Sequence, residues 1–171
     1  YYDNKIDQQT ILNKINELNN DDNIHGILVQ LPLPNHLDKD IILNSIKIEK
    51  DIDGFHESNV GKLTLNKNGL YPCTPLGVMK ILEEYNIDLC GKNVVVIGKS
   101  NIVGLPLSLL LLHNNATITI CHSKTKNIYE HTKRADILIC AIGIPHYIKK
   151  EHIKEHCIII DIGINKIEGI N

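Results

Sequence analysis

The feature that most constrains the fold is a β-branched run that ends in glycine and leads into an apolar helix. Val94 to Ile97 is this run, and a continuous β-branched stretch is typical of a parallel strand covered on both faces. Gly98 allows a sharp bend, and Leu105 to Leu112, with Pro106 in the first turn, predicts a helix. Because N–H groups converge where a strand turns into a helix, the stretch favours an anion, and we expect a dinucleotide pyrophosphate.

The glycine spacing in this turn departs from the usual dinucleotide fingerprint. That fingerprint is G-x-G-x-x-G, whereas Gly98, Ser100 and Gly104 give G-x-S-x-x-x-G. Taken alone, the stretch is equally compatible with an ordinary turn between a strand and a helix, which many α/β folds contain.

Beyond Gly91, strands and helices alternate along the chain. Strands are predicted there over 94–97, 117–121, 137–141 and 157–161, and helices over 106–113, 128–134 and 151–155; a further helix, over 76–85, is predicted before Gly91. Alternation of this kind predicts a parallel, doubly wound sheet of the Rossmann type. The predicted fold class is therefore α/β with two lobes: a partial α/β catalytic lobe over 1–74 and a nucleotide-binding domain over 75–171.

The first lobe is predicted to contain two amphipathic helices and a short strand. Apolar residues at helical spacing predict helices over 8–19, capped by Asp7, and over 38–48. Residues 26–30 are predicted to form a strand that Pro32 ends. Gln30 then lies at the carboxyl end of a strand, where α/β folds bind ligands. Residues 59–71 lack periodicity and are predicted to be loop and weak strand.

A turn dense in carboxylates follows the second helix. Asp51 and Asp53 both precede Gly54, and the commoner use of such residues is to accept hydrogen bonds from the backbone of their own turn. The alternative is a carboxylate held at a pocket rim for the N–H donors of a ligand. The sequence leaves both interpretations open.

Composition excludes several classes of protein. A net charge of −2 without a basic block argues against a nucleic-acid partner. Five cysteines without a C-x-x-C pair predict reduced thiols in a cytoplasmic protein. The longest apolar run, around 105–112, is shorter than a membrane span. Since the sequence begins with Tyr1 rather than Met, the possibility of a preceding targeting segment stays open.

One metal-binding pattern occurs and is interpreted as a coincidence. His152 to His156 matches the H-x-x-E-H pattern of zinc proteases. A zinc site needs a third ligand and a long helix, whereas this stretch abuts a predicted core strand. We therefore expect a solvent-facing helix surface and no metal.

The nucleotide is expected to be NADP. Dinucleotide folds place an acidic residue about twenty positions after the first glycine to hold the ribose hydroxyls. His122, Ser123, Lys124 and Thr125 take that place here. A carboxylate would repel a ribose 2′-phosphate, whereas hydroxyl and cationic groups bind it, and Lys99 adds a second positive charge.

Five ordered stretches resemble one family. They cover residues 26–34, 50–56, 72–77, 91–104 and 160–165. Together they resemble the bifunctional methylenetetrahydrofolate dehydrogenase/methenyltetrahydrofolate cyclohydrolase family, whose own form of the glycine turn is G-x-S-x-x-x-G. The resemblance implies that NADP+ takes a hydride from the one-carbon bridge of methylenetetrahydrofolate. Water would then open the methenyl product to formyltetrahydrofolate in the same cleft.

The resemblance implies roles for four residues on the side of the tetrahydrofolate derivatives. Gln30 would hydrogen-bond and tune the catalytic lysine, and Asp53 would accept the pterin N–H donors. Val29 and Leu31 would line the substrate cleft. A neutral amide such as Gln30 suits this chemistry, because a cationic lysine would oppose the positive charge that develops on the folate.

The resemblance implies roles for five further residues on the cofactor side. Gly98, Lys99 and Ser100 would cradle NADP, Ser123 would contact the 2′-phosphate, and the backbone at Ile164 would approach the nicotinamide. It also suggests a homodimer formed through the nucleotide domains.

Two parts of the family pattern lie beyond this chain. The family's catalytic lysine belongs to a Tyr-x-x-x-Lys motif well upstream of the Gln30 stretch, and Tyr1 with Lys5 lies too close to be that motif. A C-terminal loop rich in glycine and proline would follow Asn171. The chain is thus expected to be a central fragment that is inactive by itself. Two alternatives stay open: an NADP dehydrogenase resembling shikimate dehydrogenase, and a nucleotide-binding module without catalysis.

Overall fold

The computed structural model describes residues 2–164. The chain divides into two compact units, Tyr1–Cys73 and Thr74–Asn171. Each unit contains a hydrophobic core of its own.

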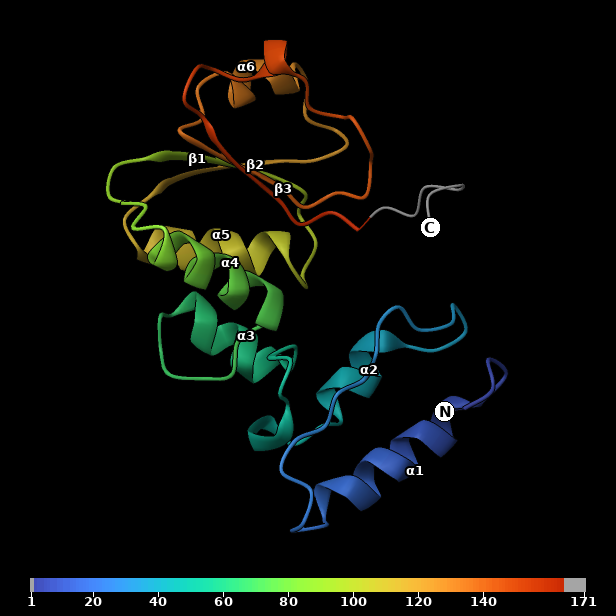
Figure 1. The fold of residues 1–171 in the computed structure, drawn as a ribbon. Helices are drawn as coiled ribbons and strands as arrows, with labels where there is room; N and C mark the ends of the chain where they lie inside the picture. Colours follow the sequence, from blue (N-terminus) through green and yellow to red (C-terminus); the bar gives the residue numbers. More distant parts are fainter. Residues whose placement is uncertain (1, 165–171) are drawn as a thin grey trace. The chain divides into compact units, whose positions relative to one another are not determined.

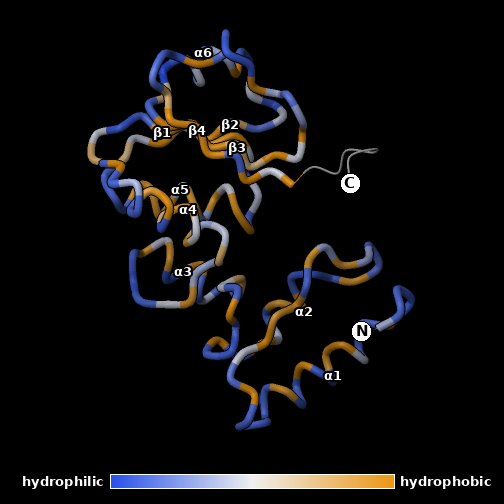
Figure 2. Tube along the Cα trace, viewed as in Figure 1, coloured by the Kyte–Doolittle hydropathy of each residue, from blue (hydrophilic) through white to orange (hydrophobic). Residues whose placement is uncertain are grey.

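The first unit is mostly helical. It contains α1 (Gln8–Asn19), α2 (Lys39–Asn44), a 3-10 turn η1 (Ile48–Lys50) and α3 (Glu57–Thr64). The carboxylate of Asp7 caps α1, as predicted, by accepting from the Thr10 amide at 2.9 Å. Hydrophobic and hydrophilic residues alternate along α1 (Figure 2), and its apolar side contributes to a core formed by Ile15, Ile27, Leu37, Ile42 and Ile46.

The prediction of a strand over residues 26–30 is wrong: the structure describes these residues, and they form no strand. Only one parallel bridge forms, between Ile27 and Asp51, with the Ile27 amide donating to the Lys50 carbonyl at 2.7 Å. A strand needs a continuous ladder, and within the described chain residues 28–30 add no further backbone hydrogen bond to this bridge. The helix predicted over 38–48 also stops early, at Asn44.

Helix α3 replaces the loop predicted over residues 59–64. The His56 ring caps it by accepting from the Ser58 amide at 3.1 Å. Asn59 and Leu63, one turn apart, are both 1% exposed. A buried asparagine takes the place of an apolar residue, which is why the hydrophobic spacing failed to indicate the helix.

Lys50 joins the end of α1 to the turn that follows η1. Its ammonium group donates to the carbonyl oxygens of Leu18, Asn19 and Asp21 at 3.0, 2.9 and 2.9 Å. A cation that caps the last carbonyls of a helix also interacts favourably with the helix dipole.

Replacing Lys50 with methionine is expected to destabilise the protein by about 2 kcal/mol, because three carbonyls lose a charged donor. Urea denaturation of the full-length protein measures this loss. Lys47→Met is a matched control, since the Lys47 ammonium makes one exposed contact, 3.4 Å from the Asn20 side chain. Equal losses in the two variants would contradict the capping role of Lys50.

The second unit is an α/β sandwich, as predicted. Its elements are α4 (Cys73–Glu84), β1 (Asn93–Ile97), α5 (Gly104–His113), β2 (Thr117–Cys121), α6 (Ile128–Thr132), β3 (Ile137–Cys140), η2 (Lys150–His152) and β4 (Ile158–Asp161). All strand pairs are parallel, in the order β2-β1-β3-β4. The helix predicted over 151–155 is only a 3-10 turn, η2.

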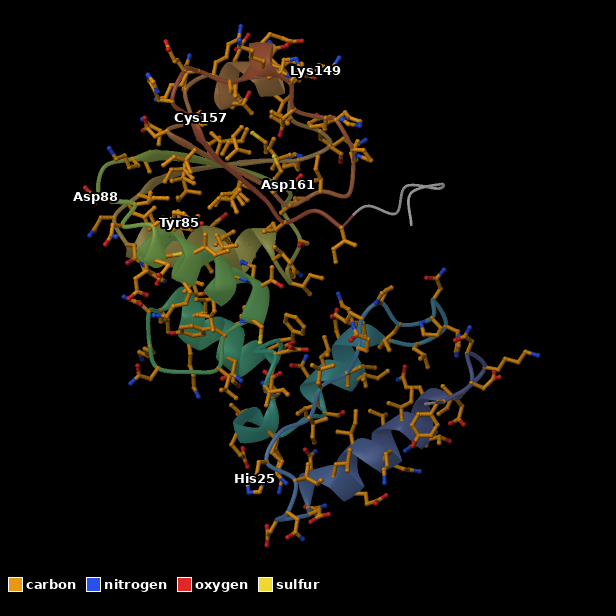
Figure 3. All side chains as sticks on the ribbon, in the orientation of Figure 1. His25, Tyr85, Asp88, Lys149, Cys157 and Asp161 are labelled. Carbon is orange, nitrogen blue, oxygen red and sulfur yellow. The ribbon has the colours of Figure 1, made fainter. Side chains whose placement is uncertain are left out.

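Helices cover both faces of this sheet (Figure 1). Helices α4 and α5 pack on one face through a cluster that includes Val78, Leu82 and Leu107. Helix α6 covers the other face, over a cluster that includes Val95 and Leu138. Cys157 immediately precedes β4, and Asp161 is its last residue (Figure 3).

The strand order places a topological switch at the carboxyl end of β1. Strand β2 lies on one side of β1 and β3 on the other. In open α/β sheets, a crevice forms where successive connections run in opposite directions, and ligands bind there. Within residues 2–164, no helix has the length and apolar character that crossing a membrane requires.

Candidate functional site

The turn after β1 is fixed by close backbone contacts. Gly98 adopts φ +118°, and a Cβ there would lie 2.6 Å from the Ala141 carbonyl oxygen. Its amide donates to the Cys121 carbonyl at 2.8 Å. Only glycine fits this position, because the backbone is left-handed and the end of β3 is too near for a side chain.

Helix α5 packs directly against this turn. A Cβ on Gly104 would lie 2.0 Å from the Gly98 carbonyl oxygen. The Ser100 hydroxyl accepts from the amides of Val103 and Gly104 at 3.2 and 3.3 Å. The Leu105 amide donates to the Ser100 carbonyl at 3.0 Å. The first helical amides therefore have partners within the protein, which corrects the expectation that they stay unpaired for an anion.

The unpaired donors instead lie one step earlier in the chain. Among the described residues, the amides of Lys99, Ser100, Asn101 and Ile102 find no acceptor. Successive backbone N–H groups in a turn form a concavity that suits an anion. These four amides are the donors available to a phosphate.

A cavity of about 470 Å³ opens beside these amides. Four of the five residues expected on the cofactor side line it together: Gly98, Lys99, Ser100 and Ser123. Ile164, the fifth, does not line it and is 93% exposed. Among the described residues, no carboxylate lines this cavity.

The wall of the cavity includes residues that the sequence did not single out. They follow β3 and are Ile142, Ile144 and Tyr147. Their position in the sequence could have identified them, because residues at the carboxyl end of a strand next to the switch point are expected to face the ligand.

The segment after β2 is a tight turn that presents Ser123. The His122 amide donates to the Thr125 hydroxyl at 2.9 Å, and the Thr125 amide donates back to the His122 carbonyl at 2.8 Å. The Lys124 amide donates to His122 Nδ1 at 3.1 Å. Ser123 and Lys124 are exposed at the tip of this turn.

Replacing Gly104 with alanine is expected to cost about 3 kcal/mol of stability and to weaken NADP binding, since the added methyl forces α5 away from the turn. Thermal unfolding and cofactor titration of the full-length protein measure both effects. Gly77→Ala is the matched control: Gly77 lies in α4, and a Cβ there meets nothing within 4 Å. If Gly104→Ala binds NADP like the parent protein, the close approach has no bearing on the site.

In the first unit, Asp51 and Asp53 have opposite environments. Asp51 is 1% exposed. Its carboxylate accepts from the amides of Phe55 and His56 at 3.2 and 2.9 Å, and from the Asn59 side chain at 2.9 Å. The commoner interpretation, bonding within the turn, is therefore right for Asp51.

Asp53 makes no such bond. It is half-buried, and its carboxylate accepts no hydrogen bond from any described residue. Burial raises the pKa of Asp53, and the negative charge of Asp51 raises it further. A carboxylate that is desolvated, faces a like charge and has no partner is a candidate for contact with a ligand.

A second cavity, of about 350 Å³, lies between α1 and residues 27–37. Val29 and Gln30 line it, whereas Leu31 and Asp53 are not among its described lining residues. The Gln30 side chain is exposed and donates to the Leu31 carbonyl at 3.0 Å. The structure thus brings two of the four folate-side residues into one pocket.

Among the described residues that line this pocket, Lys14 is the one lysine. Its ammonium is 2.7 Å from a carboxylate oxygen of Glu17, and this hydrogen bond raises the pKa of Lys14. Lys14 is therefore a cation at neutral pH and differs from the uncharged lysine that the resemblance implies.

The ring of His152 packs against another ring. It stacks on Tyr129, with centroids 3.6 Å apart, and its Nδ1 lies 3.2 Å from the Lys149 amide. Within the described residues, no cluster of histidine, cysteine and carboxylate side chains could hold a metal ion.

Comparison with known proteins identifies the family. The model of the NAD(P)-binding domain of tetrahydrofolate dehydrogenase/cyclohydrolase matches residues 72–171, and that of the catalytic domain matches residues 1–53. The bifunctional protein FolD of Dechloromonas aromatica is 55% identical over 166 residues, which are 97% of this chain and 58% of that protein.

Solved structures agree with this match. The FolD dehydrogenase/cyclohydrolase of Campylobacter jejuni is 52% identical, with a TM-score of 0.94 over 96% of this chain and 59% of that chain. The Trypanosoma brucei enzyme, solved with NADP cofactor and inhibitor, is 38% identical, with a TM-score of 0.91 over 96% of this chain and 57% of that chain. This chain spans 57–60% of the length of its curated relatives. It belongs to the tetrahydrofolate dehydrogenase/cyclohydrolase family.

Proposed function

We propose that the protein containing this chain oxidises methylenetetrahydrofolate with NADP+ and hydrolyses the methenyl product to formyltetrahydrofolate. The observation that carries this proposal is the cavity at the carboxyl end of β1. It combines four unpaired amides with Lys99 and Ser123 and has no carboxylate among its described lining residues. Such a site suits a nucleotide that carries an extra phosphate.

Each residue at this cavity has a distinct proposed role. The amides from Lys99 to Ile102 hold the pyrophosphate, and the Lys99 ammonium and Ser123 hydroxyl hold the 2′-phosphate. Gly98 and Ser100 shape the turn, and we keep the Ile164 backbone as a proposed neighbour of the nicotinamide. NADP+, when bound, supplies the hydride acceptor.

On the folate side, Asp53 supplies two carboxylate oxygens for two parallel N–H donors of the pterin. Its lack of a protein partner supports this role. Gln30 keeps the catalytic lysine of the longer protein uncharged by hydrogen bonding, and Val29 and Leu31 line the cleft. The dehydrogenase step leaves a cationic product, and an uncharged lysine can then assist the attack of water.

We further propose a cytoplasmic homodimer that forms through the nucleotide-binding unit. Strand β4, which is an edge of the sheet within residues 2–164, supports the dimer, since Ile158 and Ile159 are 37% and 47% exposed there. All five cysteines are free thiols, which supports a reducing compartment. Sedimentation of the full-length protein would measure its oligomeric state directly.

An absorbance assay tests the proposed function. Full-length protein would be mixed with methylenetetrahydrofolate and either NADP+ or NAD+, and methenyl formation and decay followed. We expect methenyl formation with NADP+ and decay faster than the uncatalysed rate. Cofactor binding without any methenyl signal would instead favour a binding module without catalysis.

A further inference from the structure

Asp51 is a buried charge whose partners come from two elements. The amides of Phe55 and His56 lie at the end of its own turn, and Asn59 lies on α3. Asn59 is itself 1% exposed, and its amide group also donates to the Ile48 carbonyl at 3.2 Å. The Asp51–Asn59 pair therefore ties both ends of the carboxylate-rich turn to α3.

Asp53 lies inside the turn that this pair closes. Gly54 donates its amide to the Asp51 carbonyl at 3.2 Å. It has φ +67°, and a Cβ there would lie 2.5 Å from the Leu70 carbonyl oxygen. The Ile52 amide donates to the Lys50 carbonyl at 3.0 Å. The backbone on both sides of Asp53 is thus fixed, whereas its carboxylate has no described partner.

We propose that Asp51 and Asn59 are positioning residues for Asp53: the pair fixes the turn that presents the Asp53 carboxylate to donors from a ligand. This inference rests on the proposed function, because the ligand is the folate. Asp51 touches no ligand in this role and acts only through Asp53.

Asp51 is also the charged neighbour that raises the pKa of Asp53, because the other charged groups near the turn act elsewhere. Lys50, from the same turn, uses its ammonium on the carbonyls at the end of α1. The His56 ring accepts from the Ser58 amide, and Lys62 lies on α3. Among the described groups, the charge of Asp51 is the one that raises the pKa of Asp53, in addition to burial.

The test is a pH titration of the Asp53 carboxyl carbon by NMR, in full-length protein and in its Asp51→Asn variant. Loss of the like charge is expected to move the Asp53 midpoint to lower pH. The KM for methylenetetrahydrofolate is expected to rise on the order of 10-fold, as for loss of a supporting residue, with the KM for NADP+ unchanged. An unchanged Asp53 midpoint and folate KM would overturn the proposal.

Two further variants separate positioning from stability. Asn44→Ala removes a side chain that bonds Glu57 at the start of α3 at 3.0 and 3.1 Å. It should lower stability without moving the Asp53 midpoint or the folate KM. Asn59→Ala removes the side chain that donates to Asp51 but leaves the Asp51 carboxylate in place, so the folate KM should rise while the Asp53 midpoint moves less than in Asp51→Asn.

The experiments distinguish an error in the positioning role of Asp51 and Asn59 from an error in the proposed function. If the parent protein does not turn over folate, the function itself is wrong. If it does, and Asp51→Asn fails to fold, Asn59→Ala decides: a raised folate KM with the NADP+ KM unchanged supports the positioning role. An unchanged folate KM in Asn59→Ala would overturn it.

Discussion

Asp53→Asn is expected to lower kcat/KM for methylenetetrahydrofolate by about 100-fold while leaving NADP affinity unchanged. The carboxylate offers two charged acceptors to two pterin donors, whereas asparagine offers one neutral acceptor and places an NH₂ group against the second donor. A loss of about 3 kcal/mol is typical of such a mismatch, and it corresponds to about 100-fold. Steady-state kinetics on full-length protein, with cofactor binding measured separately, would show it.

The same substitution is expected to leave stability equal or slightly higher at neutral pH. Because the folded-state pKa of Asp53 is raised, the folded protein binds this proton more tightly than the unfolded chain does. Stability contributed by the group is therefore present at low pH and lost as pH rises through the raised pKa. Asparagine does not ionise and so loses no stability in this way. The melting temperature of Asp53→Asn should therefore rise relative to that of the parent protein as pH rises. Lower stability of the variant at neutral pH would contradict the unpartnered environment of Asp53.

The double variant Lys99→Ala/Ser123→Ala is expected to lower affinity for NADP about 100-fold and affinity for NAD by less than about 5-fold. The phosphate loses one cation and one hydroxyl donor, at about 1.5 kcal/mol each. NAD lacks that phosphate, so it loses only weak contacts. Both side chains line the cavity beside the β1 turn.

Titration of each cofactor into full-length protein measures both affinities. His113→Ala serves as the control: His113 is the last residue of α5 and does not line this cavity. A salt series adds a check, because the NADP advantage of the parent should shrink as ionic strength rises. Equal losses for NADP and NAD would remove Lys99 and Ser123 from the 2′-phosphate site.

The second unit was largely predictable because its sequence patterns are local. The β-branched run of β1 and the helix α5 after it carry strong propensities, and alternation fixed a parallel sheet. The start of α5 was less predictable, since Gly104 begins the helix only because it can approach the Gly98 carbonyl. The use of Ser100 as an internal cap depends on that same packing.

The first unit was harder to predict because its pattern depends on distant contacts. Helix α3 is stabilised by buried Asn59, whose partner Asp51 lies eight residues earlier. From the sequence, Asp51 and Asp53 are two carboxylates of one turn. The folded structure distinguishes them: the Asp51 carboxylate is buried and accepts from Asn59, whereas the Asp53 carboxylate has no described partner.

The bonds of Ser100 have a consequence for how fast a nucleotide can bind. Its hydroxyl already holds Val103 and Gly104, so the turn has its shape without a phosphate present. Binding to such a preorganised loop carries little cost in ordering entropy. Association is then governed by diffusion and by the attraction of Lys99 for the incoming anion, without a slow rearrangement of the loop.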